Sequence, residues 1–379
     1  MLAWIRLELQ VSNKLNDSEG KGFEMRKIRM ASLILTVSVI IIVFPFIVFA
    51  DNKSQTAPPS ASYHYISITV TNTQPFMILP NFDIQITFNA QQYTEYENTY
   101  DLGNIRFYSS SGATLCSWLE SGGPIYYMPA TAIFWVKMDQ PIPAKSTVTL
   151  QMRFLKIGTE FDGKYAGEAP YLTPTYGQFD NGSNVFYNYA NFIGNSLPSG
   201  WNIINGNGIS INNGLTFTPN GSWATIGTNW TINFPYQYSI PLYTEAYIYI
   251  EHSGGGIQNE IFASSQLPNN SSLTGNVVGF QSGSGLEVES NYGGNPQVVA
   301  SATPTAKTFP AVIGIYENKL YYNYNCVLTM QNNILNNGYL CVQSWAPAVV
   351  QNIIVYYWFR QRIAPPNNIM PEISLSSIM

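Results

Sequence analysis

The chain has 379 residues and a formal net charge of −5, and charged side chains make up only 10% of it. The acidic balance argues against nucleic acid as a partner. A hydrophobic content of 45% with 14% aromatic residues argues against a disordered chain, and the length is enough for two ordinary domains, each with its own core.

The first recognisable element is an uncharged apolar run from Ala31 to Ala50, which follows a basic cluster at Arg26, Lys27 and Arg29. A basic stretch, an apolar stretch and a small-residue ending are the pattern of a secretory signal peptide. About 20 apolar residues also suffice to span a bilayer, so an uncleaved membrane anchor stays open as the alternative. Both interpretations of 1–50 predict an extracellular or cell-surface protein, and Met25 is an alternative start.

A polar spacer at 51–62, which contains Pro58 and Pro59, separates this run from the rest of the chain. From there apolar and polar residues alternate, which is the pattern of half-buried strands. About six short candidates, with turns between them, predict an antiparallel β-sandwich over 63–157. The candidates are Ile66–Val70, Phe82–Phe88, Ile105–Tyr108, Leu115–Leu119, Ile133–Met138 and Val148–Phe154.

The stretch 158–184 is rich in Gly, Pro and Tyr, has no periodicity, and is expected to connect two domains and pack on one of them. About ten further short strand candidates follow between Ile209 and Phe359, without a convincing amphipathic helix. They predict a larger jelly roll over 185–373 with a tail at 374–379. The predicted fold class is all-β: an N-terminal β-sandwich followed by a larger jelly roll, preceded by one hydrophobic export helix.

Three motifs point to one family. They are Lys164–Phe186 (KYAGEAPYLTPTYGQFDNGSNVF), Ala132–Lys137 with the following Ile142-Pro-Ala144, and the ending around Trp358–Arg362. Together they resemble a family of archaeal surface proteins in which a β-rich domain of unknown function precedes a concanavalin A-like lectin or laminin-G-like domain. The resemblance implies an exported protein with a glycan-binding or adhesive role. It brings no catalytic residues, because the family has none established.

Glu245, Tyr247, Tyr249 and Glu251 fall on one face of a predicted strand, and we take them as the candidate ligand-binding row. Aromatic rows on an exposed sheet face stack sugar rings, whereas the alternative is an ordinary solvated strand face. The expected partner is a polysaccharide or cell-surface glycan, and the membrane is a second partner if the N-terminal segment is retained. A structural subunit of a surface filament or layer remains the alternative function.

A secreted polysaccharide hydrolase is the second alternative. Glu287 and Glu289 stand at i, i+2 on one strand face, as in some concanavalin-like glucanases. The fuller pattern, with a third acid further along the strand, is absent, so a solvated strand face is the preferred interpretation and no enzyme is predicted. Four tryptophans are the most useful residues for a ligand hypothesis, although most of them are expected in cores: Trp201, Trp223, Trp230 and Trp345.

Turn residues between Cys326 and Cys341 predict a disulfide between them, which leaves Cys116 as a buried thiol. With two histidines and no suitable cysteine spacing, no metal site is predicted. Calcium stays open at Asp180-Asn181-Gly182 or Asp162-Gly163, although both are ordinary turn sequences. Six sequons are candidate glycosylation sites: Asn52, Asn181, Asn220, Asn229, Asn269 and Asn270.

Overall fold

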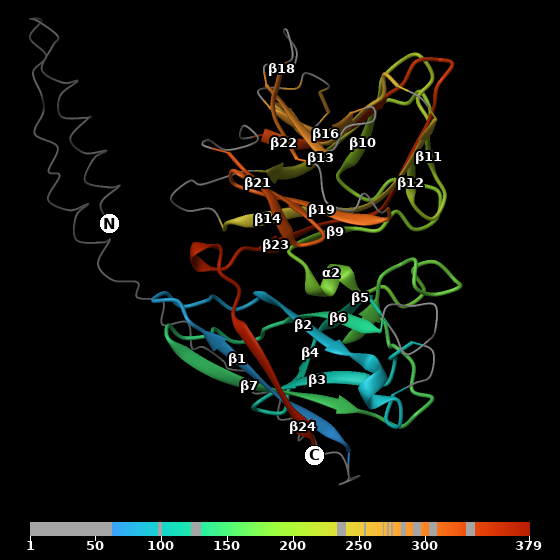
Figure 1. Cartoon of the computed structure of the whole chain (residues 1–379). Helices are drawn as coiled ribbons and strands as arrows, with labels where there is room; N and C mark the ends of the chain where they lie inside the picture. The colour runs from blue at the N-terminus through green and yellow to red at the C-terminus, as the bar shows by residue number, and fades with distance from the viewer. Residues whose placement is uncertain are drawn as a thin grey trace, which may run out of the picture. The chain divides into compact units, whose positions relative to one another are not determined.

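A computed structural model of the chain describes residues 63–379 apart from gaps at 98–100, 123–129, 233–239, 254, 268, 271–272, 274–275, 282–285, 291–296, 303–308 and 331–337. The export segment, the spacer and the sequon at Asn52 lie outside the described residues. Within the described part, no helix has the length and apolar character to cross a bilayer. Its regular secondary structure is almost all β-strand, arranged in four sheets (Figure 1).

Two of these sheets form the N-terminal sandwich. The five-stranded sheet has the order β24-β1-β7-β3-β4, with bounds Glu372–Ile378, Tyr65–Asn72, Ser146–Phe154, Ile105–Ser109 and Thr114–Leu115. The four-stranded sheet has the order β2-β6-β5-β8, with bounds Asp83–Asn89, Thr131–Lys137, Ser117–Ser121 and Ala166–Glu168. A 3-10 helix at Ala90–Tyr93 follows β2. The predicted alternation determines which side chains form the core, since every second side chain of β1 is buried.

The last strand of the chain corrects the predicted tail. Residues that we expected to be a tail form β24, which pairs antiparallel with β1 at the edge of the five-stranded sheet, as Figure 1 shows in red and blue. The chain leaves the second sandwich at Pro365 and passes through a 3-10 helix at Pro366–Asn368. The prolines mark the change of sandwich and not the end of the fold.

The other two sheets form the larger C-terminal sandwich. The seven-stranded sheet runs β10 Trp201–Asn205, β13 Ala224–Ile232, β22 Gly338–Trp345, β15 Gln258–Ser265, β16 Val277–Gln281, β17 Leu286–Ser290 and β18 Gln297–Ala302. The eight-stranded sheet runs β11 Ile209–Ile211, β12 Leu215–Phe217, β23 Gln351–Ile363, β14 Leu242–Ser253, β19 Ala311–Tyr316, β20 Lys319–Tyr322 and β21 Asn325–Thr329, with β9 Asn188–Ala190 on β23. The prediction of an all-β chain with a larger jelly-roll sandwich second is confirmed.

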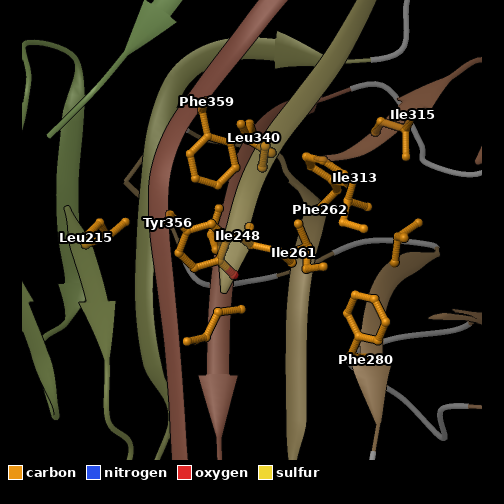
Figure 2. Packing of buried hydrophobic residues seen from close by; sticks show 14 of the residues in the cluster. Leu215, Ile248, Ile261, Phe262, Phe280, Ile313, Ile315, Leu340, Tyr356 and Phe359 are labelled. Carbon is orange, nitrogen blue, oxygen red and sulfur yellow. The ribbon is translucent and has the colours of Figure 1, made fainter. Parts of the chain in front are cut away.

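The core of the C-terminal sandwich fills the space between its two sheets. Figure 2 shows residues of this core, in which Phe262 and Phe280 of the seven-stranded sheet and Ile313 and Phe359 of the eight-stranded sheet belong to one buried cluster. The ring centres of Phe262 and Phe359 are 6.4 Å apart. Burying a side chain of this size contributes roughly 1.5–3 kcal/mol. The inward faces are thereby fully used, so the outward face of each sheet is what remains for function.

The segment predicted to connect the domains packs on the N-terminal sandwich. Its β8 pairs in parallel with β5, and a short helix, α2, spans Gly182–Val185. The outward face of the four-stranded sheet carries Trp118 and Trp135, which join a buried cluster with Phe186 and with Trp358 of β23. One outward face of the C-terminal sandwich is therefore covered.

Candidate functional site

The predicted ligand-binding row begins in this covered region. Glu245 of β14 is 3% exposed, and its two oxygens are paired with arginines of β23. Arg360 Nε donates to Glu245 Oε2 at 2.6 Å, and Arg362 donates to Oε1 from Nε at 3.0 Å and from Nη2 at 2.9 Å. Burial alone would raise the pKa of Glu245, but the two guanidinium groups hold it below its ordinary value.

Arg360 links the two sandwiches. It is fully buried, and its Nη1 donates to Glu120 Oε2 of β5 at 2.8 Å, while Nη2 donates to Tyr324 Oη at 2.7 Å. Its guanidinium carbon lies 4.4 Å from the ring centre of Trp358 and 4.6 Å from that of Trp135. The charges of the arginines and glutamates balance and every polar contact is a charge-assisted hydrogen bond, so we assign this cluster the structural role of holding the sandwiches together.

The rest of the row divides into a packed part and an open part. Tyr247 stacks between Tyr171 of the connecting segment and Trp358, with ring centres at 4.7 and 5.8 Å. Only Tyr249 and Glu251 extend beyond the covered region, where the tyrosine hydroxyl donates to Glu251 Oε2 at 3.2 Å. The shared strand face is as predicted, but the prediction of an exposed four-residue row is wrong, because the N-terminal sandwich covers half of it.

A second group of acids lies on the outward face of the seven-stranded sheet. Glu260 of β15 and Glu287 of β17 are both opposite Gly279 of the intervening strand β16, so the three positions form one row across the sheet. Glu289 is opposite Val277, one step further along. Three carboxyl groups therefore gather on one face, and within the described part of the chain none of them forms an ion pair with an arginine or lysine.

The glycine in this row makes room for the acid beside it. A Cβ added at Gly279 would lie 2.9 Å from Glu260 Oε2, and it would also meet the carbonyl oxygen of Asn259 at 2.4 Å. The side chain of Glu260 therefore extends over the glycine and towards Glu287. Any larger residue at 279 would displace this carboxyl group.

The environment keeps Glu260 protonated. Burial, together with the nearby Glu289 and Glu287, raises its pKa to about 8. Burial, with Glu287, also raises the pKa of Glu289, whose Oε2 has no hydrogen-bond donor within the described part of the chain. Glu287 is more exposed than either. A buried protonated acid next to a more exposed carboxylate is the arrangement that proton-transfer sites use.

Two tryptophans share this outward face. We call the outward face around Glu260, Glu287 and Glu289 the carboxylate face. Trp345 of β22 is opposite Gln258, and Gln343 is opposite Glu260, so these side chains belong to it as well. Trp223 precedes β13 and its ring centre lies 6.4 Å from that of Trp345. Both tryptophans are half-buried, whereas Trp201 and Trp230 are core residues. Partly exposed indoles beside amides and acids are suited to stacking and hydrogen bonding of a sugar.

Glu260 was not among the site residues predicted from the sequence. Strand β15 is buried on both faces, so its residues show no alternation and we predicted no strand there. Glu287, which lies across Gly279 from Glu260, was a candidate only through its i, i+2 spacing to Glu289. The third acid comes from a different strand and meets the pair through β16.

The two calcium candidates are occupied by hydrogen bonds. Asp180 accepts from Trp118 Nε1, Gly182 N, Tyr189 Oη and Asn191 Nδ2 at 2.7–3.0 Å. Asp162 Oδ1 accepts three backbone N–H groups, and its Oδ2 lies 3.4 Å from Arg106. Among the described residues, no group of three or more His, Cys, Asp or Glu is placed to hold a metal ion. The two aspartates are thus engaged, whereas Asn181 Oδ1 has no hydrogen-bond donor among the described residues, so calcium at either turn stays a prediction.

The predicted disulfide is not formed, because its two cysteines lie in different sheets. Cys326 is exposed on β21, and Cys341 is buried on β22, where its thiol donates to the Ile226 carbonyl oxygen at 3.1 Å. Cys116 is also a free thiol and only half-buried. Strand β21 belongs to the eight-stranded sheet and β22 to the seven-stranded sheet, so the two strands do not pair with each other.

The sequons differ in accessibility. Asn181 is 1% exposed, so it is not a glycosylation site in the folded chain. The remaining described sequons are exposed or half-buried at Asn220, Asn229, Asn269 and Asn270. These four stay predictions.

Sequence comparison with known proteins finds little. No family model matches the chain. A curated relative, the uncharacterized protein 562 of Sulfolobus islandicus rod-shaped virus 1, is 33% identical over 139 residues. The match covers 36% of this chain and only 23% of the viral protein, so the chain spans about a quarter of that relative's length.

Comparison with solved structures finds several partial likenesses. The carbohydrate recognition domain of Emp47p is 14% identical, with a TM-score of 0.34, and the match covers 44% of this chain and 90% of that one. The β-glucanase of Bacillus licheniformis is 13% identical, with a TM-score of 0.35, and the match covers 46% and 97%. TM-scores this low do not support an argument, so the fold assignment rests on the strand pairing above.

Proposed function

We propose that the chain binds glycans through the outward face of its seven-stranded sheet. One observation carries the proposal: Trp223 and Trp345 lie on the same face as Gln258, Gln343 and the acids around Gly279. Aromatic faces bind the apolar side of a sugar ring, and amides and carboxylates bind its hydroxyls. The other outward face of this sandwich is covered by the N-terminal sandwich around Tyr247 and Trp358.

The expected affinity of one such site is weak. A stacked ring contributes about 0.5–1.5 kcal/mol, and each hydrogen bond exchanged for one with water adds a similar net amount. Useful attachment would then come from many copies on one surface, through effective concentration. This agrees with an exported, surface-displayed protein, which is the location that we propose from the N-terminal segment.

The test is glycan binding by the purified chain and by single tryptophan variants. Trp345→Ala and Trp223→Ala should each weaken binding by about three- to tenfold, the loss of one stacking contact. Tyr249→Ala is the matched control, because it removes a partly exposed aromatic from the opposite sheet and should leave binding unchanged. Equal losses in all three variants, or no retention of any glycan on an array, would refute the proposal.

Glycan hydrolysis is a second candidate, favoured by the protonation of Glu260. A pKa of about 8 keeps this acid protonated at neutral pH, as a proton donor to a leaving group requires. Glu287, across Gly279, would then supply the carboxylate. Release of reducing ends that disappears in Glu260→Gln and Glu287→Gln, and persists in Glu251→Gln, would establish a hydrolase. Retention of glycan without released ends would leave binding alone.

A further inference from the structure

A separate pocket lies where the two sandwiches meet. Its volume is about 210 Å³. Gln85 and Trp135 contribute from the N-terminal sandwich, and Tyr243 and Arg362 contribute from the eight-stranded sheet. Asn368, from the segment that leads to β24, lines it as well. The pocket is on the opposite side of the C-terminal sandwich from the carboxylate face.

Several polar groups of this pocket lack a strong partner. Asn368 Nδ2 donates to Tyr321 Oη at 2.7 Å, but the buried Asn368 Oδ1 has no hydrogen-bond donor among the described residues. Since the Tyr321 hydroxyl accepts that bond, its own proton remains available to donate. Arg362 donates from Nε and Nη2 to Glu245, whereas its Nη1 donates to the Met370 sulfur at 3.9 Å, a weak acceptor.

The walls of the pocket are aromatic and its charges are balanced. The Arg362 guanidinium carbon lies 4.7 Å from the ring centre of Trp135 and 4.0 Å from that of Tyr243. Its charge is compensated by the buried carboxylate of Glu245, at 2.9 Å. An anionic ligand would therefore gain little net attraction, while a neutral ligand avoids the cost of desolvating a charge.

The geometry points to a binding site for one neutral polyhydroxylated ring, of monosaccharide size, between the two sandwiches. At about 210 Å³ the pocket is smaller than the roughly 300–1,000 Å³ of sites that take drug-sized ligands, which suits a single sugar ring. Asn368 Oδ1 would accept from a ring hydroxyl, and Tyr321 Oη and Arg362 Nη1 would donate to ring oxygens. The inference does not depend on the carboxylate face.

The test uses the full chain and four probes: glucose, galactose, mannose and myo-inositol. Saturation-transfer NMR should detect binding of at least one at a Kd near a millimolar, about what a few hydrogen bonds and one stack provide. Tyr321→Phe and Asn368→Gly should each weaken it about fivefold or more. Glycine is chosen because Asn368 has a φ of 59°, which glycine adopts without strain.

The neighbouring residue supplies the matched control. Asn367 has a φ of 55° but its amide donates to Gln74, outside the pocket, so Asn367→Gly should bind as the parent does. Failure of all four probes, or selective binding of glucuronate or glutamate in their place, overturns the inference. Binding that is lost in Trp345→Ala and kept in Tyr321→Phe would belong to the carboxylate face, and would overturn the pocket as its site.

Discussion

The two outward faces of the C-terminal sandwich each bury a glutamate, and the pKa values of the two glutamates are shifted in opposite directions. On the eight-stranded sheet, Glu245 is buried between Arg360 and Arg362, and its pKa is lowered. On the seven-stranded sheet, Glu260 is equally buried but its neighbours Glu287 and Glu289 are also acids, and its pKa is raised to about 8. Burial is the same in both places, so the partner decides whether a glutamate is a structural anion or a proton donor.

The strongest way to break the comparison is to remove the cation of the paired face. Arg360→Ala leaves Glu120 and Glu245 buried without their shared partner, which should cost about 3–5 kcal/mol of the free energy of unfolding. Urea unfolding of the parent and the variant measures this loss. Arg153→Ala is the control, since Arg153 bonds to Gln151 on a partly exposed strand face and its loss should cost less than about 1 kcal/mol. Similar small losses in both would show that the buried cluster is not structural.

The same substitution on the two faces should have opposite effects. Glu245→Gln removes a carboxylate whose lowered pKa contributes stability above its unfolded value, and that contribution is lost as pH falls through the folded pKa. Glu260 has a raised pKa, so its contribution is complete below the unfolded value of about 4.5 and is lost as pH rises towards about 8. At pH 8, Glu245→Gln should therefore lower the Tm, and Glu260→Gln should hold or raise it.

The pH profile of the parent chain sharpens this prediction. Burial raises the pKa of Asp83, Glu97 and Glu168 to about 8 as well. The Tm should then fall from pH 5 to pH 8. In Glu260→Gln, the free energy of unfolding should fall less steeply with pH, by up to about 1 kcal/mol per pH unit. A Tm that rises with pH over this window would contradict the assigned environments. The low charge content alone also predicts that the chain tolerates acid. The buried acids with raised pKa values add that the chain should be more stable at pH 5 than at pH 8.

Sequence patterns predicted those parts of this molecule that depend on local alternation. Strands β2 and β7 have one apolar face and were expected within two residues of their observed bounds. Strand β15 was missed because both of its faces are buried. The contact between Glu120 and Arg360 joins residues 240 positions apart, and only the fold brings them together.

The candidate site was predictable only in fragments. Glu245 and Tyr247 were correctly placed on one strand face, but the sandwich that covers this face is not visible in the spacing of β14. Glu287 and the tryptophans were noticed separately, and the register of β15, β16 and β22 is what makes them neighbours. Periodicity reports which face a residue occupies, whereas register and tertiary packing decide what it meets.

The smallest expected effect concerns the solvent access of Cys341, which is buried beside the acids of the seven-stranded sheet. Cys341 lies on the carboxylate face in a small apolar cluster with Ala263, Leu273 and Val277, and burial raises the pKa of its thiol to about 12. It should therefore react with a thiol reagent far more slowly than the exposed Cys326. Under denaturing conditions, all three cysteines should react.

Mass spectrometry of the time course, with Cys326→Ser to remove the fast site, measures this difference without perturbing the core. The Tm of Cys326→Ser should differ from that of the parent by no more than about a degree or two, because Cys326 is exposed. If Cys341 is labelled as fast as Cys326 in the native chain, the cluster around Leu273 opens readily. The burial that raises the pKa of Glu260 would then be transient, and the contrast between the two faces would rest on the arginines alone.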